Sequence, residues 1–399
     1  MFSRTVTLEA DFDLNNVCGG DGMLFVRDGV GHAARGIAAT ADSDTVRRVL
    51  ADIDSDGGSP VAFGLVPFLP SAASRFFIPA ETFTKHPCGT RTLTLVSSHR
   101  GGTDDEHVAA AVARATASVP PRPSSNSFNV APVTPVGRYL DSVRAARDAV
   151  RSGRLDKAVI ARDISVEASE PIDVHAVLLR LRASFGSSYR YLVDNMLGAS
   201  PELLVEVDGR TVRSHPLAGT APRTGDPQTD QRLAAELIAS TKNQVEHRLV
   251  IDMVRDTLLP HCSYLDWEAE PSIVTVANVQ HLGTACEGAL NDPPTHILDL
   301  VRALCPTPAL GGHPSADAIE FVVAHESMER GDYGGAVGWL NADGNGIFAV
   351  TIRCAELSDD RRSARLFAGG GIVAESDPWA ELAETQAKFQ AMLSAIVRP

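Results

Sequence analysis

The chain has 399 residues, with 36 Lys and Arg against 50 Asp and Glu, so its formal net charge is −14. Hydrophobic residues make up 44% and charged residues 22%, as in an ordinary globular protein. We expect neither nucleic acid nor an anionic membrane surface as partner, because both require clusters of Lys and Arg that the sequence lacks. No stretch approaches the roughly 18 apolar residues of a membrane span. The six cysteines form no CxxC pair, so we expect a cytoplasmic protein with reduced thiols.

Residues 1–120 are predicted to form an N-terminal α/β part of the fold. The alternation of apolar and polar residues over 1–11 is typical of a strand and not of a signal peptide. Apolar periodicity then predicts two helices and two strands, namely Thr45–Ile53, Asp105–Ala117, Val61–Phe68 and Ser74–Ile78.

A segment rich in Pro and Ser, residues 121–135, is predicted to connect this part to a larger one over residues 136–399. Prolines and serines are already frequent from Ser118 onward, and they interrupt helices and strands alike.

The larger part contains runs of strands separated by helices. A helix with Leu140 and Val143 on its apolar face ends at Gly153. The other predicted strands are Ala158–Val166, Tyr189–Asp194, Leu203–Val207, Ile273–Val279, Gly335–Leu340, Phe348–Ala355 and Ala364–Ala368, and the other helices are Asp230–Ala239, Gln244–Leu259, Asp299–Leu304, Ala316–Glu326 and Pro378–Ile396. Because the elements come in runs and not in regular alternation, we predict an α+β fold with a large two-layer β-sandwich core and helices on the outside.

The last helix carries Glu381, Glu384 and Lys388 on one face, at i, i+3 and i+7, after a cap and a first-turn proline at Asp377-Pro378. From spacing alone, the more ordinary interpretation is a solvent-exposed face with a Glu384–Lys388 ion pair. The alternative is a ligand site, because the glycines at 369–371 would let backbone amides approach an anion closely.

A second helix, beginning at Ser240-Thr241, places Glu246 on the same face as the apolar Val250. A carboxylate on an apolar face needs a partner. That partner is either an arginine or, together with Glu384, a hard divalent cation such as Mg²⁺, which prefers oxygen ligands. We interpret His247 as a packed or surface histidine and not as a ligand.

Three further charged residues lie beside segments that favour strands. Lys157 begins KAVIARDISV, where a lysine ordinarily extends from the strand end to solvent. Glu202 lies between a proline and an apolar run, where a buried carboxyl with a raised pKa could serve as an acid. Arg353 lies in VTIRC, a predicted core strand, and its five donors leave anion binding and structural pairing equally open.

Several motifs, taken together and in this order, resemble the chorismate-utilising enzymes. They are SPELL (200–204), HPLAGT (215–220), KNQVEHRLV (242–250), NVQHL (278–282), PTPALGGHP (306–314), MERGDYGGAVGW (328–339), VTIRCAEL (350–357) and AGGGIVAESDPWAELAET with the following Lys388 (368–388). The resemblance covers residues 136–399 and extends, less specifically, to residues 61–79. It implies the fold of that family and a small-molecule substrate, chorismate.

The resemblance also implies a role for each residue singled out above. Lys157 would be the general base that activates water, for which it has to be neutral, and Glu202 would be the general acid. The metal ligands would be Glu246, Glu384 and Glu381, with Mg²⁺ as the cofactor. The substrate would be held by Gly219, Thr220, His281, Ala309, Leu310, Tyr333, Arg353, Gly369, Gly371 and Lys388.

Within the family, the sequence is most similar to the isochorismate synthases, which isomerise chorismate by adding water at C2 while the C4 hydroxyl leaves. Ala218 stands where aminodeoxychorismate synthases use a nucleophilic lysine, and Ala309 and Leu310 lie where ammonia-using anthranilate synthases typically have a threonine. We therefore expect no glutaminase subunit. We also expect a monomer. Salicylate synthase, which goes on to eliminate pyruvate, is the alternative. The product would serve siderophore, salicylate or menaquinone biosynthesis.

Two positions depart from the pattern of the family. Asn243 stands where many relatives carry Asp or Glu, which removes one carboxylate near the metal ligands and would weaken the metal site or shift its pH dependence. Gly370, in AGGGIV, stands where alanine is commoner, and we expect this change to be harmless.

Overall fold

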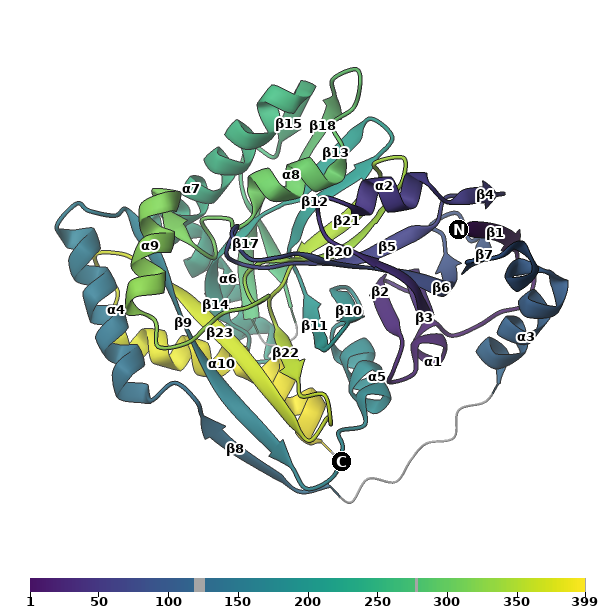
Figure 1. Cartoon of the computed structure of the whole chain (residues 1–399). Helices are drawn as coiled ribbons and strands as arrows, with labels where there is room; N and C mark the ends of the chain where they lie inside the picture. The colour runs from purple at the N-terminus through teal and green to yellow at the C-terminus, as the bar shows by residue number, and fades with distance from the viewer. Residues whose placement is uncertain (118–125, 277–278, 399) are drawn as a thin grey trace.

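The computed structural model describes residues 1–117, 126–276 and 279–398. Within them, 20 strands form one hydrogen-bonded network, and three more form a small separate sheet in the order β14 (Leu217–Pro222), β17 (Val279–Gly283) and β16 (Ser272–Thr275). Helices lie around the strands (Figure 1). The predicted α+β class is therefore confirmed.

The N-terminal part contains more strands than its sequence pattern indicated. Its strands are β1 (Phe2–Thr7), β2 (Met23–Arg27), β3 (Val30–Ala41), β4 (Asp54–Asp56), β5 (Val61–Val66), β6 (Arg75–Lys85) and β7 (Arg91–Ser97). Its helices are α1 (Leu14–Cys18), α2 (Val46–Ala51) and α3 (Asp105–Thr116), with a 3-10 helix at Arg100–Thr103. The predicted helices near 45–53 and 105–117 are confirmed, whereas β2, β3 and β7 were not predicted.

The predicted connection over 121–135 is wrong in its second half. Strand β8 (Phe128–Pro132) pairs antiparallel with the end of β9 (Lys157–Ala168), with Phe128 opposite Ala168 and Pro132 opposite Ile164. Among the described residues β8 pairs with no other strand, and a proline is tolerated on such an edge because one side of the strand needs no ladder hydrogen bonds. The first half of the connection, 118–125, lies outside the described residues.

The C-terminal part supplies the remaining elements. Its strands are β10 (Tyr189–Val193), β11 (Met196–Ser200), β12 (Leu203–Asp208), β13 (Thr211–His215), β15 (Cys262–Trp267), β18 (Cys286–Leu290), β19 (Gly312–His313), β20 (Ala336–Asn341), β21 (Gly346–Val350), β22 (Cys354–Leu357) and β23 (Ser363–Ile372). Its helices are α4 (Val136–Arg151), α5 (Val174–Ser184), α6 (Pro227–Ala239), α7 (Thr241–Leu258), α8 (Ile297–Leu304), α9 (Ser315–His325) and α10 (Pro378–Val397), with a 3-10 helix at Leu259–His261.

Two predicted strands of this part are each divided in the structure. Of the segment 273–279, residues 273–275 lie in β16 and Val279 begins β17, which pairs antiparallel with β16, while 277–278 lie outside the described residues. The segment 348–355 is divided between β21 and β22, and Arg353 lies between them with φ +51°. The prediction that Arg353 is inside a core strand is therefore wrong, because the chain leaves the extended conformation there and turns the side chain out of the strand pattern.

The strand network folds into two layers, as predicted. One layer runs from β8 and β9 through β23, β22, β11, β10, β2 and β3 to β6, and the other runs from β5 through β20, β21 and β12 to β13. Strand β6 joins them, since its start pairs with β5. Phe63 of β5 and Tyr191 of β10 lie in one hydrophobic core cluster between the layers.

Both halves of the chain contribute to both layers. Strand β2 pairs with β10 in one layer, and β5 pairs with β20 in the other. The molecule is therefore one fold and not two independent domains. Helix α10, yellow in Figure 1, lies against β23. None of the helices in the described ranges is long and apolar enough to cross a membrane.

Candidate active site

All fifteen residues that the sequence analysis assigned to a site line one cleft. One side of the cleft is formed by the small sheet and α7, which carry Gly219, Thr220, His281 and Glu246. The other side is formed by β9, β23 and α10, which carry Lys157, Gly369, Gly371, Glu381, Glu384 and Lys388. Loops between elements add Glu202, Ala309, Leu310, Tyr333 and Arg353. The structure thus brings these residues together, while the individual roles stay predictions.

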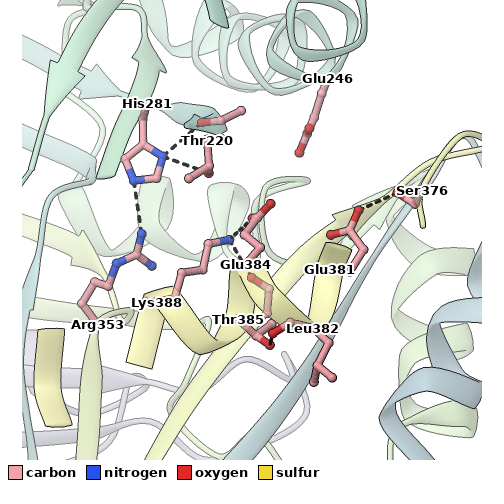
Figure 2. A network of polar contacts seen from close by, with 12 residues as sticks. Thr220, Glu246, His281, Arg353, Ser376, Glu381, Leu382, Glu384, Thr385 and Lys388 are labelled. Carbon is pink, nitrogen blue, oxygen red and sulfur yellow. Dashed lines mark hydrogen bonds and ion pairs between the residues drawn. The ribbon is translucent and has the colours of Figure 1, made fainter. Parts of the chain in front are cut away.

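Helix α10 positions its charged face through its first turn. The side chain of Asp377 accepts hydrogen bonds from the Trp379 and Ala380 amides, and Pro378 occupies the first helical position, as predicted. The Lys388 Nζ lies 2.6 Å from Glu384 Oε1, which confirms the predicted ion pair. It also donates to the carbonyl of Gly369, so this pair faces the cleft and is not a solvent-exposed pair (Figure 2).

Two carboxyls on this face have opposite pKa shifts. Burial, and next to it the charge of Glu384, raises the pKa of Glu381 to about 7, although Ser376 donates a hydrogen bond to it at 2.8 Å. Burial also disfavours the ionised form of Glu384, but Lys388 and then Lys242 outweigh it and lower the pKa of that carboxyl. At neutral pH, Glu381 is therefore partly protonated, whereas Glu384 is ionised beside Lys388.

The three glycines of 369–371 lie in β23 and not in a ligand-binding turn. A Cβ on Gly370 would lie 2.7 Å from Glu381 Oε2, and a Cβ on Gly371 would lie 2.5 Å from Glu246 Oε1 and 2.7 Å from Lys157 Cε. Glycine is needed here because charged side chains of the protein itself lie directly over the strand. This close approach places Glu246 and the two acids of α10 over adjacent residues of one strand.

The carboxylates fit part of a divalent-cation site. Figure 2 shows Glu246 reaching from α7 toward the side that carries Glu381 and Glu384. Within the described ranges, no three His, Cys, Asp or Glu side chains are grouped closely enough to hold a metal ion by themselves. Mg²⁺ commonly takes one or two protein carboxylates plus substrate oxygens and water. The donor set therefore fits Mg²⁺ if the substrate supplies the remaining oxygens.

Lys157 is buried at the beginning of β9. Its side chain is 1% exposed, and its Nζ lies 2.8 Å from Glu246 Oε1. The interpretation as a lysine that extends to solvent is wrong, since β23 and α7 cover the strand end. The neighbour that orders Lys157 is therefore the carboxyl group of Glu246.

Glu202 is buried between β11 and β12, as its position between proline and an apolar run suggested. The side chain accepts a hydrogen bond from the Leu217 amide at 3.3 Å. Burial raises its pKa to about 7, and the amide and the charges of Lys157 and Arg353 only partly oppose this. A carboxyl with that pKa is partly protonated at neutral pH and can donate a proton.

Arg353 is buried and held by a neutral histidine. Its Nη2 lies 3.2 Å from His281 Nε2, whereas His281 Nδ1 lies 3.0 Å from the carbonyl oxygen of Gly219 and 3.2 Å from Thr220 Oγ1. A carbonyl only accepts hydrogen bonds, so Nδ1 carries the proton and Nε2 accepts from the guanidinium. Burial, followed by the charge of Arg353, lowers the pKa of His281 to about 3. This row of contacts is visible in Figure 2.

The guanidinium of Arg353 has no carboxylate partner among the described residues, and its Nε makes no hydrogen bond there. Tyr333 also faces the cleft, with its ring stacked on Phe367 at 5.2 Å between centroids. A buried cation without a counter-ion is a binding site for an anionic group of a ligand. Of the two interpretations left open for Arg353, anion binding is the one that the geometry supports.

Sequence reasoning missed Lys242, which lines the cleft and whose Nζ lies 3.9 Å from Glu381 Oε1. The sequence could have indicated this position, because Lys242 precedes Glu246 by one helical turn on α7 and so lies on the same face of the helix. Asn243 also lines the cleft, and it donates to the capping Ser240 at 2.9 Å beside Gly219. His247 is buried and bonded to Thr284 at 2.8 Å, which confirms that it is a packed histidine.

Comparison with known proteins places this site in a family. Residues 42–397 match the family described as chorismate binding enzyme. The isochorismate synthase DhbC of Bacillus subtilis is 39% identical over 284 residues, which are 68% of this chain and 71% of that protein. The isochorismate synthase MenF of the same species is 34% identical over 329 residues, 80% of this chain and 69% of that protein.

Among solved structures, the menaquinone-specific isochorismate synthase MenF of Escherichia coli is similar with a TM-score of 0.81. The match covers 99% of this chain and 94% of that one at 24% identity, so it shows a shared fold. With the family match over most of its length, the chain belongs to the chorismate binding enzymes.

Proposed function

We propose that the protein is an Mg²⁺-dependent isochorismate synthase, which isomerises chorismate to isochorismate. The observation that carries the proposal is that two buried groups, Lys157 and Glu202, line one cleft together with Arg353, which has no carboxylate partner among the described residues. Ala218 lines the same cleft, so that position offers no amine nucleophile and leaves water as the attacking group. The relatives named above as isochorismate synthases support the same assignment.

The reaction requires a base and an acid. Water loses a proton to Lys157 Nζ as its oxygen bonds to ring C2, the two conjugated double bonds of the ring shift from C1–C2 and C5–C6 to C1–C6 and C4–C5, and the C4–O bond breaks. Glu202 donates its proton to the departing hydroxyl, which leaves as water. Because Lys157 is paired with Glu246, the base role requires the lysine to separate from that carboxylate and give up its proton before each turnover.

The two carboxylates of the substrate would be bound in different ways at the two ends of the cleft, one by an arginine and the other through a metal ion. Arg353, oriented by His281, holds one substrate carboxylate, and Tyr333 lies beside it. Glu246, Glu381 and Glu384 would hold Mg²⁺, which supplies charge neutralisation for the second carboxylate when bound. We expect the enzyme to work as a monomer without a glutaminase subunit.

Incubation of the purified protein with chorismate and Mg²⁺, followed by chromatography of the products, tests the proposal. The expected product is isochorismate without pyruvate, and added ammonium salt leaves the product unchanged. Salicylate with pyruvate would show the alternative activity, and the absence of turnover would refute the assignment. A parallel incubation with excess chelator tests the metal requirement, since it should stop turnover reversibly.

A further inference from the structure

A buried ion pair close to the cleft contacts three of the segments that form the cleft. Arg330 and Glu326 have side chains 3% and 2% exposed, with Arg330 Nη2 2.5 Å from Glu326 Oε1 and Nε 2.8 Å from Oε2. Neither residue lines the cleft. The pair is therefore not placed to touch substrate, and its role has to be sought in what it holds.

The pair ties β9 to the loop of residues 306–311. Arg330 donates to the carbonyl of Leu310 and to the carbonyl of Val159, each at 2.7 Å. Glu326 accepts a hydrogen bond from the amide of Ala161 at 2.6 Å. Val159 and Leu310 both line the cleft, and Lys157 lies two residues before Val159 on β9.

The same arginine supports Tyr333. The Tyr333 amide donates to the carbonyl of Arg330 at 3.0 Å. The guanidinium lies 4.2 Å from the ring centroid of Phe68 and 5.9 Å from that of Tyr333. One planar side chain thus contacts the strand of the proposed base, the loop that carries Ala309 and Leu310, and the tyrosine beside Arg353.

Stability alone does not require such a pair, because well-packed apolar residues commonly stabilise a core as well as a buried ion pair does. The planar fork of arginine, in contrast, can bind several acceptors in fixed directions, which a lysine cannot do. We propose that Arg330, held by Glu326, is a positioning residue that sets the spacing between β9, the 306–311 loop and Tyr333, and so the fit of the cleft to its substrate. This inference rests on the proposed function.

The test compares Arg330→Lys with Arg190→Lys. Arg190 is 2% exposed and donates to Asn15 at 3.1 Å, outside the cleft lining, so it controls for the loss of a buried guanidinium. We expect the KM for chorismate to rise about tenfold or more in Arg330→Lys, because two charge-assisted hydrogen bonds to the backbone are lost. The expected fall in kcat is smaller, and KM is unchanged in Arg190→Lys. Glu326→Gln, which retains an acceptor for Ala161, should raise KM in the same direction by less.

Hydrogen exchange gives a readout that does not depend on chorismate turnover. The amides of Leu310, Gly311 and Tyr333 are hydrogen-bonded at the supported segments and should exchange faster in Arg330→Lys than in Arg190→Lys. An unchanged KM in both Arg330→Lys and Glu326→Gln, with lower kcat only, would overturn the proposal and leave a purely structural pair. If Arg330→Lys does not fold, the KM and the hydrogen exchange of Glu326→Gln test the proposal in its place. If the wild-type protein lacks turnover, the proposed function fails, and unchanged exchange at these amides would independently refute the positioning role.

Discussion

The two ends of the cleft differ in how their charges are compensated. At the carboxylate end, Glu246 is paired with Lys157 and Glu384 with Lys388. At the arginine end, Arg353 has only the neutral His281 as a side-chain partner among the described residues. The arginine end is therefore ready to receive an anion without rearrangement, whereas the carboxylate end has to exchange lysine partners when a cation and substrate arrive.

This difference explains how a chain of net charge −14 can bind an anion. The neutral state of His281 is essential to the arginine end, since its protonated form would repel the guanidinium and lose the acceptor nitrogen. Because burial lowers its pKa to about 3, that state persists over the whole physiological range. Any pH dependence of turnover should thus arise elsewhere in the cleft.

The largest effect is expected from Lys157→Met, which removes the amine between the two ends and keeps an apolar side chain of similar length. Turnover should fall about 10²–10⁴-fold, the usual contribution of a general base. Steady-state assays would measure this fall in turnover. The control is Lys85→Met, which removes the amine of the ion pair between Lys85 and Asp11. Turnover within a few-fold of the wild type would remove Lys157 from the mechanism.

Glu202→Gln should lower turnover by a similar factor of about 10²–10⁴ and yet stabilise the protein at alkaline pH. The pKa of Glu202 in the folded protein is about 7, above the ordinary value of 4.5. Between about pH 4.5 and 7, the unfolded chain releases this proton and the folded protein keeps it. The stability of the wild type therefore falls as the pH rises through this range. Above pH 7 the variant should be more stable by about 1–3 kcal/mol.

Urea unfolding at pH 4.5 and pH 8 measures this difference for Glu202→Gln. The exposed Glu356 provides the control, since Glu356→Gln should change stability little at either pH. In the wild type, kcat/KM should fall as pH rises through about 7, because the acid has to be protonated. Equal stability of variant and wild type at pH 8 would show that Glu202 is not a buried acid with a raised pKa.

Arg353→Lys tests the arginine end alone. The variant keeps a positive charge but loses the planar donor set, so the KM for chorismate should rise about 10–100-fold, as for the loss of one or two charge-assisted hydrogen bonds. Initial rates at several Mg²⁺ concentrations would separate the two ends, because the Mg²⁺ requirement should stay as in the wild type. A change in Mg²⁺ requirement without a change in KM would contradict this division.

Glu384→Gln tests the carboxylate end. The affinity for Mg²⁺, measured by calorimetry, should decrease at least about tenfold. Loss of a residue that only hydrogen-bonds a metal ligand already weakens binding by about that factor, and loss of a ligand itself should weaken it at least as much. Glu356→Gln again serves as the control, since it lies outside the cleft lining. Unchanged Mg²⁺ affinity would exclude Glu384 as a ligand and leave its pair with Lys388 as its only role.

The parts of the fold that were predicted are those with local signals. Helix α10 has a cap, a first-turn proline and regular apolar spacing, and α7 has a serine cap. Strand β3, in contrast, reads VGHAARGIAATA, which contains few β-branched residues, and its pairing with β2 and β6 supplies what the local pattern lacks. Arg353 was placed in a strand because its neighbours favour one, whereas tertiary contacts interrupt the strand there.

In the site, too, contacts within one helix could be predicted from the sequence, whereas contacts between distant segments could not. Spacing on α10 was enough to place Glu381, Glu384 and Lys388 on one face, but no spacing relates Lys157 to Glu246, which meet only in the folded chain. Their joint assignment came from the resemblance to a family. The expectation that Gly370 is a harmless replacement stays a prediction, and the structure adds that Glu381 Oε2 would lie 2.7 Å from a Cβ at this position.

The smallest effect is expected from Gly370→Ala, compared with Gly371→Ala. A methyl group at 370 would meet only the end of a flexible side chain, Glu381 Oε2, which can move by a few tenths of an ångström at the cost of its bond from Ser376. At 371 the methyl group would meet both Glu246 and the buried Lys157. We expect kcat/KM to change less than about tenfold for Gly370→Ala and at least tenfold more for Gly371→Ala, because the second change separates a buried ion pair. Equal effects would show that the close approach of Glu246 and Lys157 to β23 is not required for turnover.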